Sequence, residues 1–188
     1  MKNIVVALRV LVLMSVLLGL VYPLVMTALA QVVFTHEASG SLIVRDGQTV
    51  GSELIAQAFI SDRYFHGRPS AIGYDAAGSG ASNYGPANRA MWDRIVAQAS
   101  AIRTREHLPA DAAIPADLLT ASASGLDPHI SVEAARIQVP RIARTRQLPP
   151  EMILEMIEKN KHHRLAGIQD TAYVNVLKLN VGLDEVKP

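Results

Sequence analysis

The sequence of 188 residues contains no cysteine, only nine aromatic residues and a net charge of +1. Without cysteine, a disulfide framework and a zinc–thiolate site are both excluded, and the chain suits either redox compartment. The 18 basic residues include Lys2 and Arg9, which leaves 16 basic against 17 acidic residues in the rest of the chain. This balance indicates no basic surface of the kind that nucleic-acid binding requires.

Several catalytic and nucleotide-binding signatures are also missing. The P-loop string G-x-x-x-x-G-K-[ST] does not occur, and the dinucleotide fingerprint fails because Asn83 stands where its third glycine is required. The histidines lack the H-E-x-x-H spacing of a zinc site, and no G-x-S-x-G nucleophile elbow is present. An enzyme is therefore not indicated, and we expect neither catalytic nor metal-binding residues.

What the sequence does contain is one long apolar run, VLVLMSVLLGLVYPLVMTALAQVVF, at residues 10–34. A helix of about 25 residues is roughly 38 Å long, which is enough to cross a hydrocarbon core of about 30 Å with some tilt. We therefore expect a short N-terminal segment at 1–9, a transmembrane helix at 10–34 and an extramembrane domain at 36–188.

A cleaved signal peptide is the alternative to this anchor. Lys2 and Arg9 supply a basic start, and the small-x-small string at 28–30 resembles a cleavage site. The apolar core of a signal peptide usually has about 7 to 15 residues. The run in this chain is longer, which favours an uncleaved anchor. The same two basic residues favour a cytoplasmic N-terminus and an extracytoplasmic domain.

The domain itself reads as one α+β unit. A hairpin is predicted at 41–51, where Asp46-Gly47 fits a type I′ turn. Four helices are predicted: one from Ser52 over SELIAQAF, one from near Pro86 to about Arg103, one from Ser131, and one over 150–164. Pro140 is expected to kink or split the third helix. A β-prone run follows at 173–181. The apolar stripe expected to be buried on the second of these helices is Met91, Trp92, Ile95, Val96, Ala99 and Ile102.

Two loops are rich in small polar residues, GSGASNYGPANR at 78–89 and TASASGLDPHIS at 120–131. Glycines and serines in the first loop would expose amides to an anion such as phosphate. A turn-rich loop that only packs on its neighbours has the same composition. Composition alone leaves both interpretations open.

Aromatic residues and arginines gather in one part of the chain. Six of the nine aromatic residues lie between Phe59 and Trp92, together with three arginines, and Arg94 follows two residues later. Such clusters are typical of binding surfaces. The alternative is that a small domain uses its few large side chains to keep an irregular segment ordered.

Four strings carry a resemblance to a known family: GSELIAQAF, YFHGRPSAIGYDAAGSGASNYGPANR, DLLTASASGLDPHISVEAARIQVPRIA and VNVLKLNV, in that order behind one membrane helix. They resemble the C subunit (KdpC family) of the bacterial Kdp potassium-transporting P-type ATPase. The resemblance covers nearly the whole chain. It implies a non-catalytic accessory subunit in the inner membrane, with one transmembrane helix and an extracytoplasmic domain.

In that family the partners are a potassium-channel-like subunit and an ATP-hydrolysing subunit, with the lipid bilayer as a third neighbour. The family role is that of a catalytic chaperone that raises the ATP affinity of the hydrolysing subunit, so ATP is expected only together with that subunit. A direct nucleotide-binding subunit, or a membrane-anchored periplasmic enzyme without a partner, remains the alternative.

The resemblance also suggests site residues. The family loop is compared with a Ser-Gly-Gly-Ser signature of transport ATPases, and here residues 79–82 read Ser-Gly-Ala-Ser. An alanine hinders close approach of the backbone to phosphate, so a packed loop is favoured over a phosphate site. The candidate nucleotide contacts are Gly78, Ser79, Gly80, Ser82 and Asn83. The candidate partner-interface residues, chosen from the aromatic and arginine cluster, are Tyr64, Phe65, Arg68, Tyr84 and Trp92.

Overall fold

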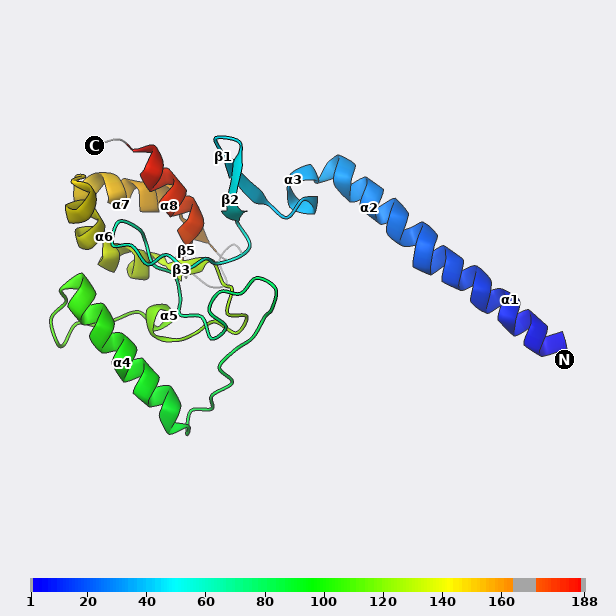
Figure 1. The fold of residues 1–188 in the computed structure, drawn as a ribbon, viewed down its shortest axis with the longest axis horizontal. Coiled ribbons are helices and arrows are strands. Elements are labelled where there is room, and N and C mark those ends of the chain that lie inside the picture. Colours follow the sequence, from blue (N-terminus) through cyan, green and yellow to red (C-terminus); the bar gives the residue numbers. More distant parts are fainter. Residues whose placement is uncertain (1, 164–171, 187–188) are drawn as a thin grey trace. The chain divides into compact units, whose positions relative to one another are not determined.

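The computed structural model describes residues 2–163 and 172–186 and divides the chain into two compact units, Met1–Val50 and Gly51–Pro188 (Figure 1). The first unit holds a long helix, a short helix and a hairpin. The second unit is a mixed helix and small-sheet domain, which confirms the predicted α+β class.

The first unit begins with one continuous helix over Lys2–Val33, whose most apolar stretch of 18 residues has a mean hydropathy of 2.8. It consists of α1 (Lys2–Val16), a π-helical turn η1 (Leu17–Val21) and α2 (Tyr22–Val33). In the wider turn, the amide of Tyr22 bonds to the carbonyl of Leu17, five residues earlier. Pro23 follows directly; proline has no amide hydrogen and crowds the preceding turn of an α-helix. None of the helix is buried within the chain, and it is long and apolar enough to cross a membrane.

The short helix α3 (Thr35–Ala38) and the predicted hairpin follow this helix. The hairpin pairs β1 (Leu42–Arg45) with β2 (Gln48–Ser52). Asp46 and Gly47 have φ values of 49° and 75°. Positive φ at both central residues is what a type I′ turn requires, so the predicted turn chemistry is confirmed.

The core of the second unit lies between a small antiparallel sheet and three helices. The strand order is β3 (His129–Ser131), β5 (Ala172–Asn175) and β4 (His162–His163). The helices α6 (Val132–Arg146), α7 (Pro150–Lys159) and α8 (Val176–Glu185) pack on one another and on the sheet. The fully buried aliphatic side chains of these elements are Ile130, Ile142, Ile153, Ile157, Val174, Leu179 and Leu183, and Ile102 and Leu118 join the same core from α4 and α5.

Helix α6 begins as predicted, because the Ser131 hydroxyl accepts from the amide of Ala134 at 3.1 Å. Pro140 lies inside α6 and does not split it. Helix α7 ends at Lys159, earlier than predicted, because His162 and His163 pair with β5 instead. The end of the predicted helix, Arg164, lies outside the described residues.

The helix predicted from Ser52 is wrong. The Ser52 hydroxyl accepts from the amide of Leu54 at 3.1 Å, which starts a single turn. The amide of Ala56 then donates to the carbonyl of Leu126 at 2.9 Å. Because this bond engages the amide that would continue the helix, the chain leaves the turn in an irregular conformation.

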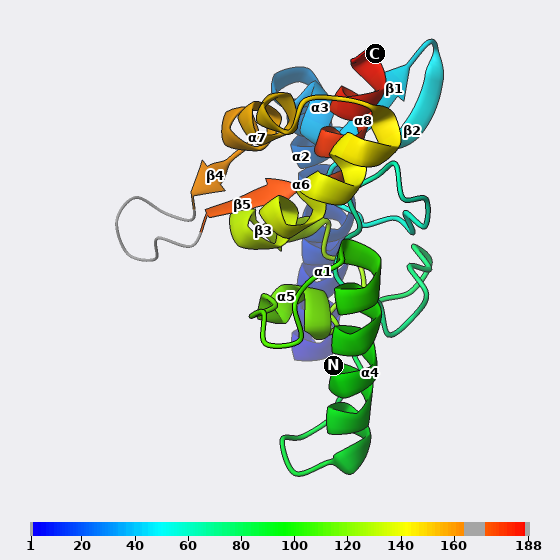
Figure 2. The ribbon, with the colours of Figure 1, turned by 90° about the vertical axis from the view of Figure 1, so that its left-hand side faces the viewer.

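The second predicted helix is α4 (Arg89–Glu106), with α5 (Ala116–Leu119) after it. The Asn88 side chain caps α4 by accepting from the amide of Ala90. The predicted buried stripe is only partly correct: Ile102 is buried and Met91, Ile95 and Ala99 are half-buried, but Trp92 is 53% and Val96 67% exposed. The physical reason is that α5 and α6 cover only the C-terminal part of α4, whose N-terminal part extends away from them (Figures 1 and 2).

The β-prone run predicted at 173–181 is only half correct, since β5 gives way to α8 at Val176. Asn175 accepts from the amide of Lys178 at 3.1 Å and so caps a helix. Leu179 and Leu183 then lie on one buried face at a spacing of four residues. The apolar residues that predicted a strand therefore form the buried face of a helix after Val176.

Candidate partner-binding surface

The two small-residue loops, 78–88 and 120–128, pack against each other in the second unit. The amide of Gly80 donates to the carbonyl of Ser124 at 2.9 Å, and the Ser79 hydroxyl donates to the same carbonyl at 3.3 Å. Because glycine has no side chain, the two backbones approach closely enough for these bonds. Parts of two of the four strings that carry the family resemblance are therefore in direct contact.

Gly125 is the tightest point of this contact. Its φ is +71°, and a Cβ atom there would lie 2.6 Å from Cγ1 of Ile72 and 2.9 Å from the carbonyl oxygen of Gly80. Both distances are shorter than a non-bonded contact permits. Glycine is required here both by the backbone conformation and by the space.

Three of the five predicted nucleotide contacts already bond within the fold. The amide of Gly78 donates to a carbonyl three residues earlier at 3.2 Å, and Ser79 and Gly80 bond to the second loop as described above. Ser82 is half-buried, and Asn83 is exposed with a φ of 54°. The loop thus has a packing role, and nucleotide contact by these residues stays a prediction.

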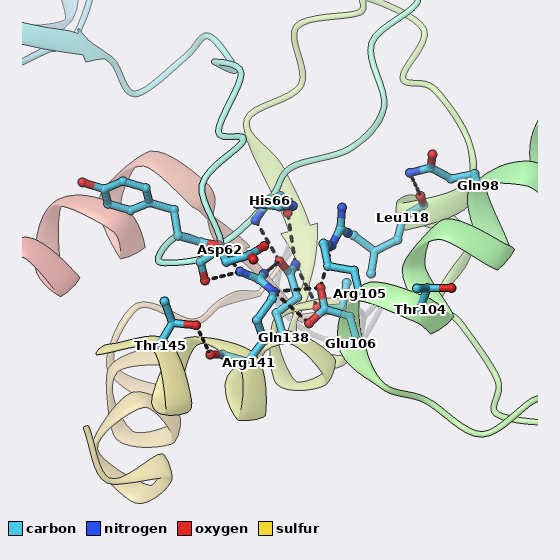
Figure 3. Close-up of polar contacts among 12 residues, drawn as sticks. Asp62, His66, Gln98, Thr104, Arg105, Glu106, Leu118, Gln138, Arg141 and Thr145 are labelled. Carbon is cyan, nitrogen blue, oxygen red and sulfur yellow. Dashed lines mark hydrogen bonds and ion pairs between the residues drawn. The ribbon is translucent and has the colours of Figure 1, made fainter. Parts of the chain in front are cut away.

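The side chain of Arg141 is buried inside the second unit, with 2% of it exposed. Figure 3 shows its polar contacts. Its Nε lies 3.0 and 3.1 Å from the two carboxylate oxygens of Glu106, which is fully buried at the end of α4. Its Nη1 donates to the carbonyls of Asp62 and Tyr64. Arg105 donates to Glu106 at 2.9 Å. These bonds offset the cost of removing two charges from water.

Two side-chain amides fix the end of the irregular segment 62–66, whose carbonyls at Asp62 and Tyr64 bond to Arg141. Gln138 accepts from the amide of His66 at 2.8 Å and donates to the carbonyl of that residue at 3.1 Å (Figure 3). Asn180 does the same for Phe65, at 2.8 and 3.0 Å. Each amide side chain pairs with one donor and one acceptor, as a neighbouring strand would. The segment is therefore fixed without being part of a sheet.

A second arginine, Arg146, connects this segment to α8. It donates to the carbonyls of Arg63 and Leu183 at 2.7 and 2.9 Å and to the Asp184 carboxylate at 2.7 Å. The Tyr64 hydroxyl donates to the other oxygen of Asp184 at 2.9 Å, and its ring centroid lies 4.9 Å from the guanidinium carbon. Tyr64 therefore has an internal hydrogen bond and an internal cation–π contact.

The five predicted interface residues separate into two groups. Phe65 is completely buried, so its side chain belongs to the core and presents nothing to a partner. Tyr64 is half-buried in the contacts just described, and the Arg68 side chain is 25% exposed. Tyr84 and Trp92 are 38% and 53% exposed. Of the five, Tyr84 and Trp92 therefore remain the exposed interface candidates, and their role in binding stays a prediction.

These two aromatic residues lie on or beside the uncovered part of α4. Val96 lies one helical turn after Trp92 and is 67% exposed. Arg89 and Arg94 are exposed in the same part of the helix, and the Arg94 guanidinium lies 5.7 Å from the centroid of the Tyr84 ring. We call Tyr84, Arg89, Trp92, Arg94 and Val96 the Trp92 surface. It combines exposed apolar area with cations.

The carboxylate of Asp127 connects the second loop to Arg68 and to the backbone of His129. It accepts from Nη1 of Arg68 at 3.0 Å and from the amide of His129 at 3.0 Å. Burial raises the pKa of this carboxyl, but the bonds from His129 and Arg68 outweigh burial and lower the pKa to about 2. Arg68 is thereby engaged inside the domain, and its carbonyl accepts from the Tyr74 hydroxyl at 2.7 Å.

Carboxylates also cover the outer edge of β3. Asp127 accepts from His129, and Asp117 accepts from the amide of Ser131 at 2.6 Å. Both amides would otherwise be free to pair with another strand, so the acidic side chains protect the edge of the sheet. Beside this edge lies an open groove of about 810 Å³ with an apolar floor that includes Ile130 and Tyr173.

Comparisons of the whole chain with known proteins identify one family. The family model for KdpC, the c chain of K⁺-transporting ATPase, matches residues 4–185. A potassium-transporting ATPase KdpC subunit of Rhodopseudomonas palustris (strain BisB18) is 46% identical over 93% of this chain and 93% of its own length. KdpC subunits of Polaromonas naphthalenivorans and Mycobacterium bovis are 47% and 42% identical, covering 93% and 96% of this chain and 90% and 96% of their own lengths.

The chain belongs to the KdpC family. It is accordingly a non-catalytic subunit of a K⁺-transporting ATPase. Within residues 2–163 and 172–186, no group of three histidine or acidic side chains is placed to hold a metal ion.

The residues that organise this KdpC domain were not singled out from the sequence. They are Glu106, Gln138, Arg141, Arg146 and Asn180, polar side chains that are 9% exposed or less. Their partners lie 35 to 115 residues away in sequence. The one available signal is that Gln138 and Arg141 share the buried face of an amphipathic helix with Ile142, where a solvent-facing role is not expected.

The half-buried His66 predicts a pH-dependent stability. Burial, followed by the charges of Arg105 and Arg141, lowers the pKa of its imidazole from 6.5 to about 4. As the pH falls below 6.5, the unfolded chain binds a proton that the folded domain refuses until the pH nears 4, so stability is lost on acidification. We expect His66 to contribute a decrease of about 1–2 kcal/mol in unfolding free energy between about pH 7 and 4.5, allowing for partial exposure.

Urea unfolding of the full chain in detergent at the two pH values measures this decrease. His66→Gln should unfold with a smaller pH dependence than the wild type, whereas the exposed control His107→Asn should keep the wild-type dependence. Equal pH dependence in His66→Gln and the wild type would refute the assignment.

Proposed function

We propose that the chain is an accessory subunit that anchors and stabilises an ATP-driven, high-affinity potassium-uptake complex and assists its ATP-hydrolysing subunit as a chaperone of ATP binding. Its partners in this proposal are that subunit and a potassium-channel-like subunit. The observation that carries the proposal is the helix Lys2–Val33, which has no charged side chain from Val10 onward and is not buried by any part of the described chain. Such a surface requires lipid or other membrane helices around it.

The proposed arrangement is single-pass in the cell inner membrane. Lys2 and Arg9 favour a cytoplasmic N-terminus, which places residues 36–188 outside the cytoplasm. The predicted span at 10–34 overlaps the helix Lys2–Val33 in all but its last residue, Phe34. ATP and the domain would then be on opposite sides of the membrane, so assistance to the hydrolysing subunit would pass through subunit contacts.

Direct nucleotide binding is the less supported function. The amide of Gly80 and the hydroxyl of Ser79 are engaged with the second loop, so neither is free for a phosphate. Phosphate sites typically present several free amides to the ligand, often at a helix N-terminus. A role through contacts with the other subunits and the bilayer is better supported, and Tyr84 and Trp92 are the predicted interface residues whose side chains are exposed.

A helix exchange tests this function. Residues 2–33 are replaced by an unrelated apolar transmembrane helix of the same length, and the chain is co-expressed with the other subunits. We expect the variant to stay in the membrane but to lose most of its co-purification with them, because helix packing in lipid depends on surface shape. The apparent KM for ATP of the remaining ATPase should rise.

The matched control replaces only residues 3–8, before the predicted span, keeps Lys2 and Arg9, and should assemble as the wild type does. Undiminished co-purification and an unchanged KM after the full exchange would contradict the proposal. A mature N-terminus near Gln31 by intact mass would show instead that the helix is a cleaved signal.

A further inference from the structure

The Trp92 surface is apolar and aromatic at its centre and cationic at its rim. The indole Nε1 of Trp92 already donates to the carbonyl of Pro86 at 2.9 Å, so the exposed remainder of the ring is apolar. The Arg89 side chain is 92% exposed, and its one described ion pair is a 4.0 Å contact with Asp93. The rim therefore has a net positive charge that is available for a partner.

We propose that the Trp92 surface lies against an anionic lipid bilayer, the same bilayer that holds the chain's own helix. The proposal rests on the membrane anchoring in the proposed function and extends it by naming what this surface contacts. Tryptophan and tyrosine favour the headgroup region, where an apolar ring body and a wet polar edge are both satisfied. Arginines beside them attract anionic headgroups.

Two observations favour lipid over a second protein. The exposed side chains lie on the uncovered N-terminal part of a helix, a convex feature that a deformable bilayer accommodates without a complementary pocket (Figure 2). The bilayer is also attached to the domain by the same polypeptide, through the helix that ends at Val33. Such a tether raises the effective concentration of the membrane at the surface, so that a weak contact becomes well populated.

Trp92 is the sole tryptophan of the chain, which makes the test direct. The full chain, without other subunits, is reconstituted into vesicles of phosphatidylcholine and phosphatidylglycerol, with and without brominated acyl chains. We expect Trp92 emission to be blue-shifted relative to detergent and quenched by the brominated lipids, most strongly by bromine near the headgroups, since interfacial insertion reaches about 5–10 Å.

Charge variants separate this contact from chance proximity. Arg89→Gln combined with Arg94→Gln should lower the fraction of molecules whose Trp92 surface contacts the bilayer, by up to roughly fivefold for each arginine. Quenching of Trp92 should then no longer depend on the phosphatidylglycerol content of the vesicles. Val96→Asp should reduce quenching without altering the charge of the arginines. Arg144→Gln, an exposed arginine in the last turn of α6, is the matched control and should leave quenching unchanged.

Unquenched, water-like emission in every brominated vesicle would overturn the proposal. Emission that shifts only when the other subunits are added would also overturn it, by assigning the surface to a protein contact. Both outcomes are separable from failure of the proposed function, which is measured by the helix exchange and by co-purification rather than by Trp92 emission.

Discussion

Replacing Arg141 with methionine is expected to cost about 3–5 kcal/mol of unfolding free energy, a large part of the roughly 5–15 kcal/mol of a typical domain. The change leaves the Glu106 carboxylate, which is fully buried, without its main cation. It also removes the donor to the carbonyls of Asp62 and Tyr64. Urea unfolding of the full chain in detergent, followed by circular dichroism, measures the loss.

Two companion variants make the result specific. Arg144→Met alters an exposed arginine of the same helix and should change stability by no more than about 0.5 kcal/mol. The double variant Arg141→Met, Glu106→Leu should recover part of the loss, because an apolar pair replaces an unpaired buried charge. The interpretation fails if Arg141→Met is no less stable than Arg144→Met.

Gly125→Ala is expected to destabilise the second unit by about 3 kcal/mol or more. A left-handed conformation costs a non-glycine residue roughly 1–2 kcal/mol, and the new methyl group must also displace Ile72 and the backbone of Gly80. The two small-residue loops would have to separate, with loss of the bond from Gly80 to Ser124. The same denaturation measurement tests this prediction.

Substitutions at two other glycines separate the cost of the left-handed backbone conformation from the cost of disturbed loop packing. Gly73 has a φ of +66° but open space around it, so Gly73→Ala should show only the conformational cost of about 1–2 kcal/mol. Gly78 has neither a left-handed φ nor a neighbour within 4 Å, and Gly78→Ala should be within about 0.5 kcal/mol of wild type. Equal effects at Gly125 and Gly73 would mean that loop packing adds nothing.

Sequence reasoning succeeded where the cause is local. The apolar run, the Asp46-Gly47 turn and the Ser131 cap each depend on residues within a few positions of one another, and each is present in the structure. It failed where a distant partner decides. The Ala56 amide bonds to Leu126 instead of continuing a helix, and no pattern near Ala56 contains that information.

The same distinction applies to the candidate surface. The sequence placed Phe65 and Trp92 in one aromatic cluster, but the structure buries the first completely and exposes the second. Local composition cannot separate them, because both are large apolar side chains next to polar residues. Phe65 belongs to the core, where its backbone pairs with Asn180, whereas Trp92 lies on the part of α4 that α5 and α6 leave uncovered.

By itself, the sequence determined that the chain has one membrane-spanning candidate helix, an α+β domain and the loop strings of its family, because hydropathy, turn chemistry and capping act over a few residues. The tertiary structure alone decided which polar side chains became the centre of the domain. Arg141 and Glu106 are 35 residues apart in sequence and share a buried ion pair. Burial strengthens electrostatic attraction and makes an unpaired charge costly, so their roles exist only once the core has formed.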